Sequence, residues 1–132
     1  AWMTSYREQK MENGKRVAPV VSIVCNFSRP AGNAPALLSL DETRTFFHEF
    51  GHALHGLLSN VNYGSLAGTS VPRDFVELPS QIMENWCWEK EALDLFAHHY
   101  QTKEPIPATL FERLRAARTF RAANAMIRLN IR

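Results

Sequence analysis

Two histidines and a neighbouring glutamate give this 132-residue sequence its clearest chemical signal. His48, Glu49 and His52 form the pattern H-E-x-x-H inside a run with helical spacing. An α-helix advances about 100° per residue, so the two histidines project about 40° apart and their imidazoles can meet at one metal ion. Glu49 projects about 60° from His52, where its carboxylate can reach a water on that metal. The pattern therefore predicts a zinc hydrolase site, with Glu49 as the general base.

The helix that must hold this motif is predicted at 39–59. Ser39 and Glu42 have the S-x-x-E form of a capping box, which places the start of the helix. Gly51 is a costly residue inside a helix and predicts the close approach of a bulky neighbour. Apolar residues recur at helical spacing on a side away from the histidines: Phe47, Phe50, Leu54, Leu57 and Leu58.

Catalytic zinc needs a third protein ligand and one position open for water. The metzincin continuation is excluded, because it requires glycine at position 55 and histidine at position 58, where this sequence has His55 and Leu58. A carboxylate on a later helix is the other common solution. Position favours Glu77, in the first turn of a helix predicted at 74–100. Asp74 and Glu77 also form a possible capping box, so spacing alone leaves Glu77 equally suited to capping that helix.

The other predicted elements are a strand, a loop and a second capped helix. Residues 18–27 are rich in β-branched types and predict a strand, placed at a sheet edge by its proline. Such an edge can bind an extended peptide, although a plain core strand fits equally well. Residues 60–73 contain two glycines and predict either a mobile lid or a plain connection. Thr109 begins a second capping-box pattern, and the arginine-rich helix after it is predicted at 109–132.

Local backbone signals add two expectations. Asn13-Gly14 predicts a tight turn, and Pro79 inside a helix predicts a distorted first turn.

Composition describes an ordinary folded chain, with 45% hydrophobic residues and a net charge of +2. No apolar run is long enough to span a membrane, and no signal peptide is visible. Cys25 and Cys87 are too far apart for a metal-ligand pattern and predict reduced thiols, which fits the cytoplasm. The arginines near the end lack interleaved aromatic residues, so we expect no nucleic-acid partner. Because the chain opens on Ala1, we expect it to be a fragment of a longer protein.

Longer motifs add a family resemblance. Residues 48–52 (HEFGH) and 68–81 (GTSVPRDFVELPSQ), followed by 84–86 (ENW), resemble the thimet oligopeptidase family of zinc peptidases. Within that family, 26–30 (NFSRP) and 35–39 (PALLS) are most similar to the bacterial peptidyl-dipeptidases. The resemblance covers nearly the whole chain. It implies that His48, His52 and Glu77 bind one zinc ion and that Glu49 is the general base.

The resemblance also predicts how substrate is bound. The family's glycine-rich loop corresponds to 64–70 here and its substrate-binding strand to 20–26, so Gly64, Gly68 and Asn26 are the predicted substrate-binding residues. Glu84 lies seven residues after Glu77, on the same helix face, and we infer that it supports a zinc-binding histidine.

These observations predict a mainly α protein with a small β element, α+β in class. We expect a zincin-like catalytic segment over 1–132, with a strand and loop region at 1–38, that packs against missing parts of a larger helical peptidase. The expected activity is zinc-dependent hydrolysis of short peptides with release of C-terminal dipeptides. The alternatives are an endo-acting oligopeptidase of the same family, a zinc-binding fragment without activity, or a non-catalytic module. We expect neither a nucleic-acid nor a membrane partner, and a cytoplasmic location.

Overall fold

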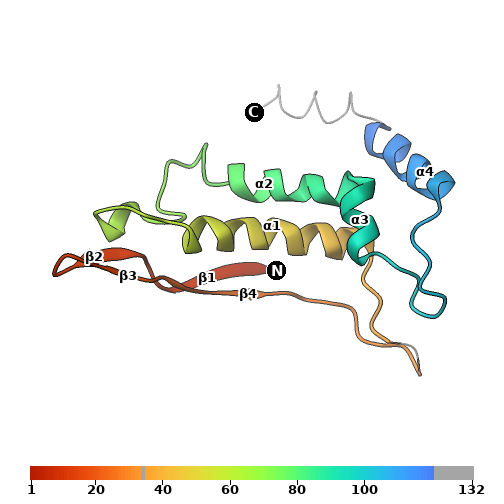
Figure 1. Ribbon diagram of the computed structural model, residues 1–132, viewed down its shortest axis with the longest axis horizontal. Coiled ribbons are helices and arrows are strands. Elements are labelled where there is room, and N and C mark those ends of the chain that lie inside the picture. The colour runs from red at the N-terminus through yellow and green to blue at the C-terminus, as the bar shows by residue number, and fades with distance from the viewer. Residues whose placement is uncertain (34, 121–132) are drawn as a thin grey trace. The chain divides into compact units, whose positions relative to one another are not determined.

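The computed structural model describes residues 1–33 and 35–120 (Figure 1). They fall into two compact units, Ala1–Cys87 and a second that begins at Trp88. The first unit contains four short strands and the helices α1 (Leu40–Leu57) and α2 (Leu78–Glu84), and the second contains α3 (Lys90–Phe96) and α4 (Ala108–Thr119). The chain is thus mainly helical with a small β element, as expected. None of the described helices is long and apolar enough to cross a membrane.

The strands form two small antiparallel sheets. β1 (Trp2–Arg7) pairs with β4 (Val20–Val24), and β2 (Lys10–Glu12) pairs with β3 (Lys15–Val17). Among the described strands, β4 pairs only with β1, so it is an edge strand as predicted, although shorter than 18–27. β1 was not predicted, because its residues are at most half-buried and show no clear alternation.

The predicted tight turn joins β2 to β3. Asn13 and Gly14 have positive φ angles of 52° and 73°, the backbone that a two-residue Asn-Gly hairpin turn requires. The Asn-Gly prediction is confirmed.

α1 has the predicted capping box. The Ser39 hydroxyl accepts a hydrogen bond from the Glu42 amide at 3.2 Å, and the Glu42 carboxylate accepts one from the Ser39 amide at 2.8 Å. The helix ends at Leu57 with Leu58 as its C-terminal cap, close to the predicted limits of 39–59. Acidic residues in its first turn also complement the helix dipole.

The prediction of one continuous helix at 74–100 is wrong at the start of that helix. α2 begins at Leu78, and Pro79 therefore lies in the first helical turn, where its missing N–H removes no hydrogen bond. The distortion expected at Pro79 is unnecessary for the same reason. Residues 73–77 form turns instead, and Asp74 caps no helix.

The same prediction is also wrong in the middle. α2 stops at Glu84, a 3₁₀ turn η2 (Asn85–Trp88) follows, and Glu89 is extended before α3 begins. Asn, Trp and Cys are weak helix formers, and this run leaves little intrinsic preference for an α-helix. The tighter turn buries Cys87, whose exposed fraction is 1%.

α4 begins one residue earlier than predicted and without the predicted capping box. Pro107 is its N-cap, and the Pro107 carbonyl accepts hydrogen bonds from the amides of Leu110 and Phe111, both at 3.0 Å. Thr109 already lies inside the helix, so its hydroxyl cannot cap the start. The last part of the helix predicted at 109–132, residues 121–132, lies outside the described residues.

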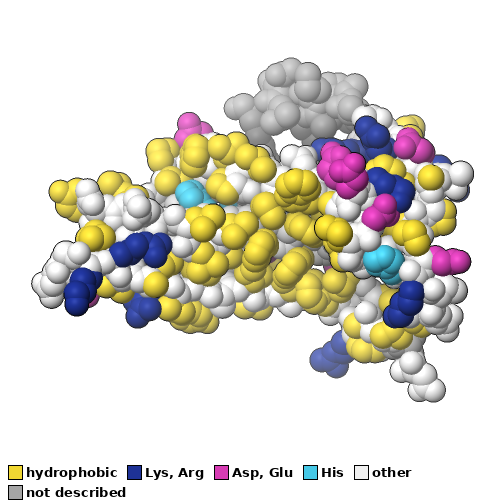
Figure 2. All heavy atoms as spheres, in the orientation of Figure 1, with side chains coloured by type: hydrophobic (Ala, Val, Ile, Leu, Met, Phe, Trp, Pro, Cys, Tyr) yellow, Lys and Arg dark blue, Asp and Glu magenta, His cyan; other side chains and the backbone are white. Residues whose placement is uncertain are grey.

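α1 and α2 lie side by side in the first unit, with β1 and β4 packed against α1 (Figure 1). Figure 2 shows hydrophobic side chains spread over the face where these two helices lie. A Cβ atom at Gly51 would lie 2.5 Å from the Ser80 Cα and 2.6 Å from the Pro79 carbonyl oxygen. Gly51 therefore allows the backbone of α2 to touch α1, which explains the close approach that the sequence predicted there.

Candidate metal centre

α1 supplies the histidine half of the candidate metal centre. His48 and His52 lie one turn apart, with ring centroids separated by 4.9 Å and ring planes at 87°. Their side chains are 27% and 13% exposed, so both are largely covered by protein. Two imidazoles on one helix face thus share a single region of space, as the H-E-x-x-H spacing predicts.

α2 brings Glu77 to the same place. Its Oε2 atom lies 3.3 Å from the Nε2 atoms of both His48 and His52. One ligand atom from each of the three residues can be chosen so that all lie within 4.8 Å of one another. Two imidazole nitrogens and a carboxylate oxygen are a ligand set of catalytic zinc, so the residues fit a metal ion.

Glu77 is the N-cap residue of α2, but its side chain makes no capping hydrogen bond. The carboxylate turns to the histidines instead, and the Ser80 hydroxyl lies 2.9 Å from both the Glu77 Oε2 atom and the Glu77 carbonyl oxygen. Ser80 is fully buried and can donate its single hydrogen to either acceptor. This contact joins the carboxylate to the first turn of α2.

Glu84 contacts the other side of His48. Its Oε1 atom lies 2.7 Å from the His48 Nδ1 atom. Because a carboxylate accepts and does not donate, Nδ1 bears the hydrogen, and in the neutral imidazole the lone pair is then on Nε2, on the side of Glu77. This contact is compatible with the role inferred for Glu84 from its spacing, which stays a prediction.

Glu49 lies on α1 between the two histidines and is buried, with 9% of its surface exposed. A carboxylate beside a metal ligand and shielded from bulk water suits a general base. That role stays a prediction.

The predicted glycine-rich loop packs against the C-terminal end of α1. The Gly68 amide donates to the Ser59 hydroxyl at 2.7 Å, and a Cβ atom at Gly68 would lie 3.1 Å from the Gly56 Cα. Gly68 also has a positive φ of 55°, which favours glycine. Gly64 begins the 3₁₀ turn η1 (Gly64–Leu66), next to Lys10 of β2.

Sequence reasoning missed Gln9, which holds the beginning of this loop. Gln9 is fully buried, its side-chain oxygen accepts from the Val61 amide at 2.7 Å, and its side-chain nitrogen donates to the Val61 carbonyl at 3.1 Å. A single glutamine between two strands gives no sequence pattern that could have revealed this role.

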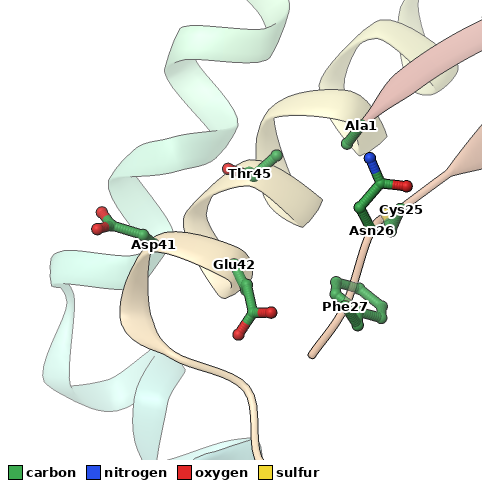
Figure 3. Close-up of a pocket in the computed structure, with 7 residues that line it drawn as sticks. All are labelled: Ala1, Cys25, Asn26, Phe27, Asp41, Glu42 and Thr45. Atoms are coloured by element: carbon green, nitrogen blue, oxygen red, sulfur yellow. The ribbon is translucent and has the colours of Figure 1, made fainter. Parts of the chain in front are cut away.

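Asn26, the other predicted substrate-binding residue, follows β4 and lines a cavity of about 240 Å³ (Figure 3). The cavity walls come from the first turns of α1, the segment after β4 and Ala1. The Glu42 carboxylate closes one side, accepting hydrogen bonds from the Ser28 amide and hydroxyl at 2.7 and 2.8 Å. Hydrogen bonds from Ser39 and Ser28 lower the pKa of Glu42 to about 2. None of the three candidate metal ligands lines this cavity.

The cysteines form no disulfide with each other. Burial raises the pKa of the Cys87 thiol to about 11, so this thiol stays protonated at neutral pH. Cys25 and Cys87 are both free thiols in this structure.

Comparison with known proteins places the chain in a family. Residues 1–131 match the model of peptidase family M3. The chain is 45% identical to oligopeptidase A of Escherichia coli (strain K12) over 130 residues, which are 97% of this chain and 19% of that protein. It is also 45% identical to dipeptidyl carboxypeptidase of Salmonella typhimurium (strain LT2) over 129 residues, 98% of this chain and 19% of that protein.

A third relative, probable cytosolic oligopeptidase A of Arabidopsis thaliana, is 47% identical over 111 residues, 83% of this chain and 16% of that protein. The chain therefore spans about a fifth of the length of the curated relatives it matches. The match over nearly the whole chain confirms the resemblance that the H-E-x-x-H motif and the motif around Glu77 predicted. The chain belongs to peptidase family M3, the thimet oligopeptidase family of metallopeptidases.

Proposed function

We propose that this chain is the zincin-like, zinc-binding catalytic segment of a peptidase that hydrolyses short peptides and releases C-terminal dipeptides. The observation behind the proposal is the convergence of His48, His52 and Glu77 within 4.8 Å, beside the buried Glu49, in a chain of a metallopeptidase family. His48, His52 and Glu77 would hold one zinc ion. When bound, zinc would supply Lewis-acid activation of a water and of the scissile carbonyl group.

The other site residues would then move a proton and orient a ligand. Glu49 accepts a proton from the attacking water at its carboxylate and delivers it to the leaving amine. Glu84 keeps the hydrogen of His48 on Nδ1, so that Nε2 is available as a ligand.

Peptide binding is proposed along β4 and the neighbouring loops. The free edge of β4 can add the main chain of an extended peptide as a further strand, with Asn26 at the end of that edge. Gly64 and Gly68 would act by shaping the loop. The Gly68 amide already donates to Ser59 and is therefore not a free donor for substrate.

An endo-acting oligopeptidase is the second candidate. Relatives named oligopeptidase A and dipeptidyl carboxypeptidase match this chain with the same identity of 45%, so identity does not separate the two activities.

The two candidates are tested with one peptide in two forms, with a free C-terminal carboxylate or with a C-terminal amide. Incubation with the zinc-loaded protein and mass spectrometry of the products should show dipeptide release from the free form alone. Cleavage of the amidated form would favour the endo-acting enzyme. The Glu49→Gln variant should leave both forms uncut, and it serves as the control for contaminating peptidases.

Because the chain spans 19% of the length of its bacterial relatives, we propose that other parts of a longer protein pack against it and complete the substrate channel. If neither form of the peptide is cut while zinc is bound, the segment binds zinc without activity of its own.

A plant relative is named as cytosolic, and we propose a cytoplasmic location here too. We propose no nucleic-acid partner.

A further inference from the structure

Glu84 uses its two carboxylate oxygens on two different partners. Oε1 lies 2.7 Å from the His48 Nδ1 atom, and Oε2 lies 3.8 Å from the Arg44 Nε atom. Arg44 has a second ion pair, with Asp41 at 3.5 Å. A chain of contacts thus leads from an arginine to one candidate metal ligand.

Arg44 is placed so that it can restrict the orientation of the Glu84 carboxylate. Arg44 and His48 are four residues apart on α1, so the helix fixes their separation, whereas Glu84 comes from α2. The terminal torsion of a glutamate is broad, and a carboxylate held through one oxygen can rotate about it. A cation near the second oxygen attracts it electrostatically, which opposes that rotation and favours the position in which Oε1 contacts His48.

The Glu84 carboxylate is accessible to solvent, so its position can be disturbed by water. Arg44, Thr45, His48 and Glu84 line a hollow of about 250 Å³, and the Glu84 side chain is 28% exposed. Water in such a hollow can compete for the carboxylate oxygens.

We propose that Arg44 is a positioning residue of the metal centre, which acts on His48 through Glu84. The proposal rests on the zinc site proposed above. Arg44 touches neither substrate nor metal in this account; it restricts the carboxylate that orients the ligand.

The test is the zinc dissociation constant of the purified protein, measured by competition with a chromogenic chelator. Loss of an outer partner of a metal ligand typically weakens metal binding about 10- to 100-fold, and we expect Glu84→Gln in that range. Arg44→Gln should weaken binding less, about threefold, because its contact is longer and partly exposed. In the Glu84→Gln background, Arg44→Gln should have no further effect.

Asp41→Asn is the matched control. This variant removes the other ion pair of Arg44. The Asp41 side chain is 86% exposed, and its change should leave the zinc dissociation constant unchanged. Arg44→Lys keeps the positive charge and should restore part of the affinity lost in Arg44→Gln. Arg44→Met, which keeps a long apolar side chain without the charge, replaces Arg44→Gln in both backgrounds if that variant does not fold.

Two results would overturn the proposal: an unchanged dissociation constant for Arg44→Gln, or the same weakening with and without Glu84. The second result would mean that Arg44 acts on general stability. Absence of zinc binding by the unsubstituted protein would instead refute the zinc site itself, so the two failures are distinguishable.

Discussion

Helices α1 and α2 meet at the candidate metal centre, but different interactions fix each of them. α1 has 18 residues, a complete capping box at Ser39 and acidic residues in its first turn. α2 has 7 residues and no side-chain capping bond, and a helix this short is not stable by itself. Its position depends on the contact of its backbone with Gly51. The histidine half of the site thus follows from local sequence, whereas the glutamate half depends on packing.

The largest effect is expected from Gly51→Ala, which tests whether the position of α2 depends on its packing against α1. The added Cβ would lie 2.5 Å from a backbone atom of Ser80, so α2 must move away from α1. We expect the free energy of unfolding to fall by about 2 kcal/mol, even after the roughly 1 kcal/mol that alanine adds to a helix. Zinc affinity should fall with it, because Glu77 moves with α2. Chemical denaturation and zinc titration measure the two effects.

Gly56→Ala is the matched control on the same helix. Its Cβ would meet a single side-chain atom, Cγ1 of Val21, at 3.2 Å, and a side chain can adjust. The free energy of unfolding should stay within about 1 kcal/mol of the original value, with zinc affinity unchanged. Equal losses in the two variants would contradict the special role of the contact between Gly51 and α2.

A smaller effect is expected from Ser80→Ala, which removes the hydroxyl beside the Glu77 carboxylate. Loss of this buried hydrogen bond should cost about 1 kcal/mol of unfolding free energy and weaken zinc binding up to about 10-fold. Ser59→Ala removes a comparable hydroxyl at the loop end of α1 and should affect stability alone. If both variants bind zinc equally well, Ser80 does not support Glu77.

The smallest effect is expected at the start of α1 and depends on pH. The pKa of Glu42 is lowered from 4.5 to about 2, mainly by hydrogen bonds from Ser39 and Ser28. A lowered folded-state pKa means that Glu42 stabilises the folded state fully above about pH 4.5 and loses this contribution as the pH falls towards 2. Denaturation of the original protein and Glu42→Gln should therefore differ at pH 6 and converge near pH 2. A difference that does not change with pH would contradict the assigned cause.

The features that could be predicted from the sequence are those fixed by local patterns. The capping box of Ser39, the histidine spacing and the Asn13-Gly14 turn are local patterns, and the structure has all three. The capping box predicted at Thr109 failed because Pro107 provides the first helical carbonyl acceptor instead.

Residues that act across the chain were harder to predict. The end of α2 was misplaced, because the run Asn85–Trp88 adopts a 3₁₀ turn that buries Cys87. Spacing alone could not distinguish the two roles of Glu77, and it gave no sign of Gln9. Both depend on a contact with a residue far away in the sequence, with His48 for Glu77 and with Val61 for Gln9.

The central claim is that His48, His52 and Glu77 form one zinc site. The most direct measurement is the metal content of the purified protein, determined by mass spectrometry after dialysis with zinc and then against a weak chelator. We expect one zinc per chain in the original protein and in Glu49→Gln, and loss of zinc in Glu77→Gln. Absence of zinc in the original protein, or full zinc content in Glu77→Gln, would contradict it.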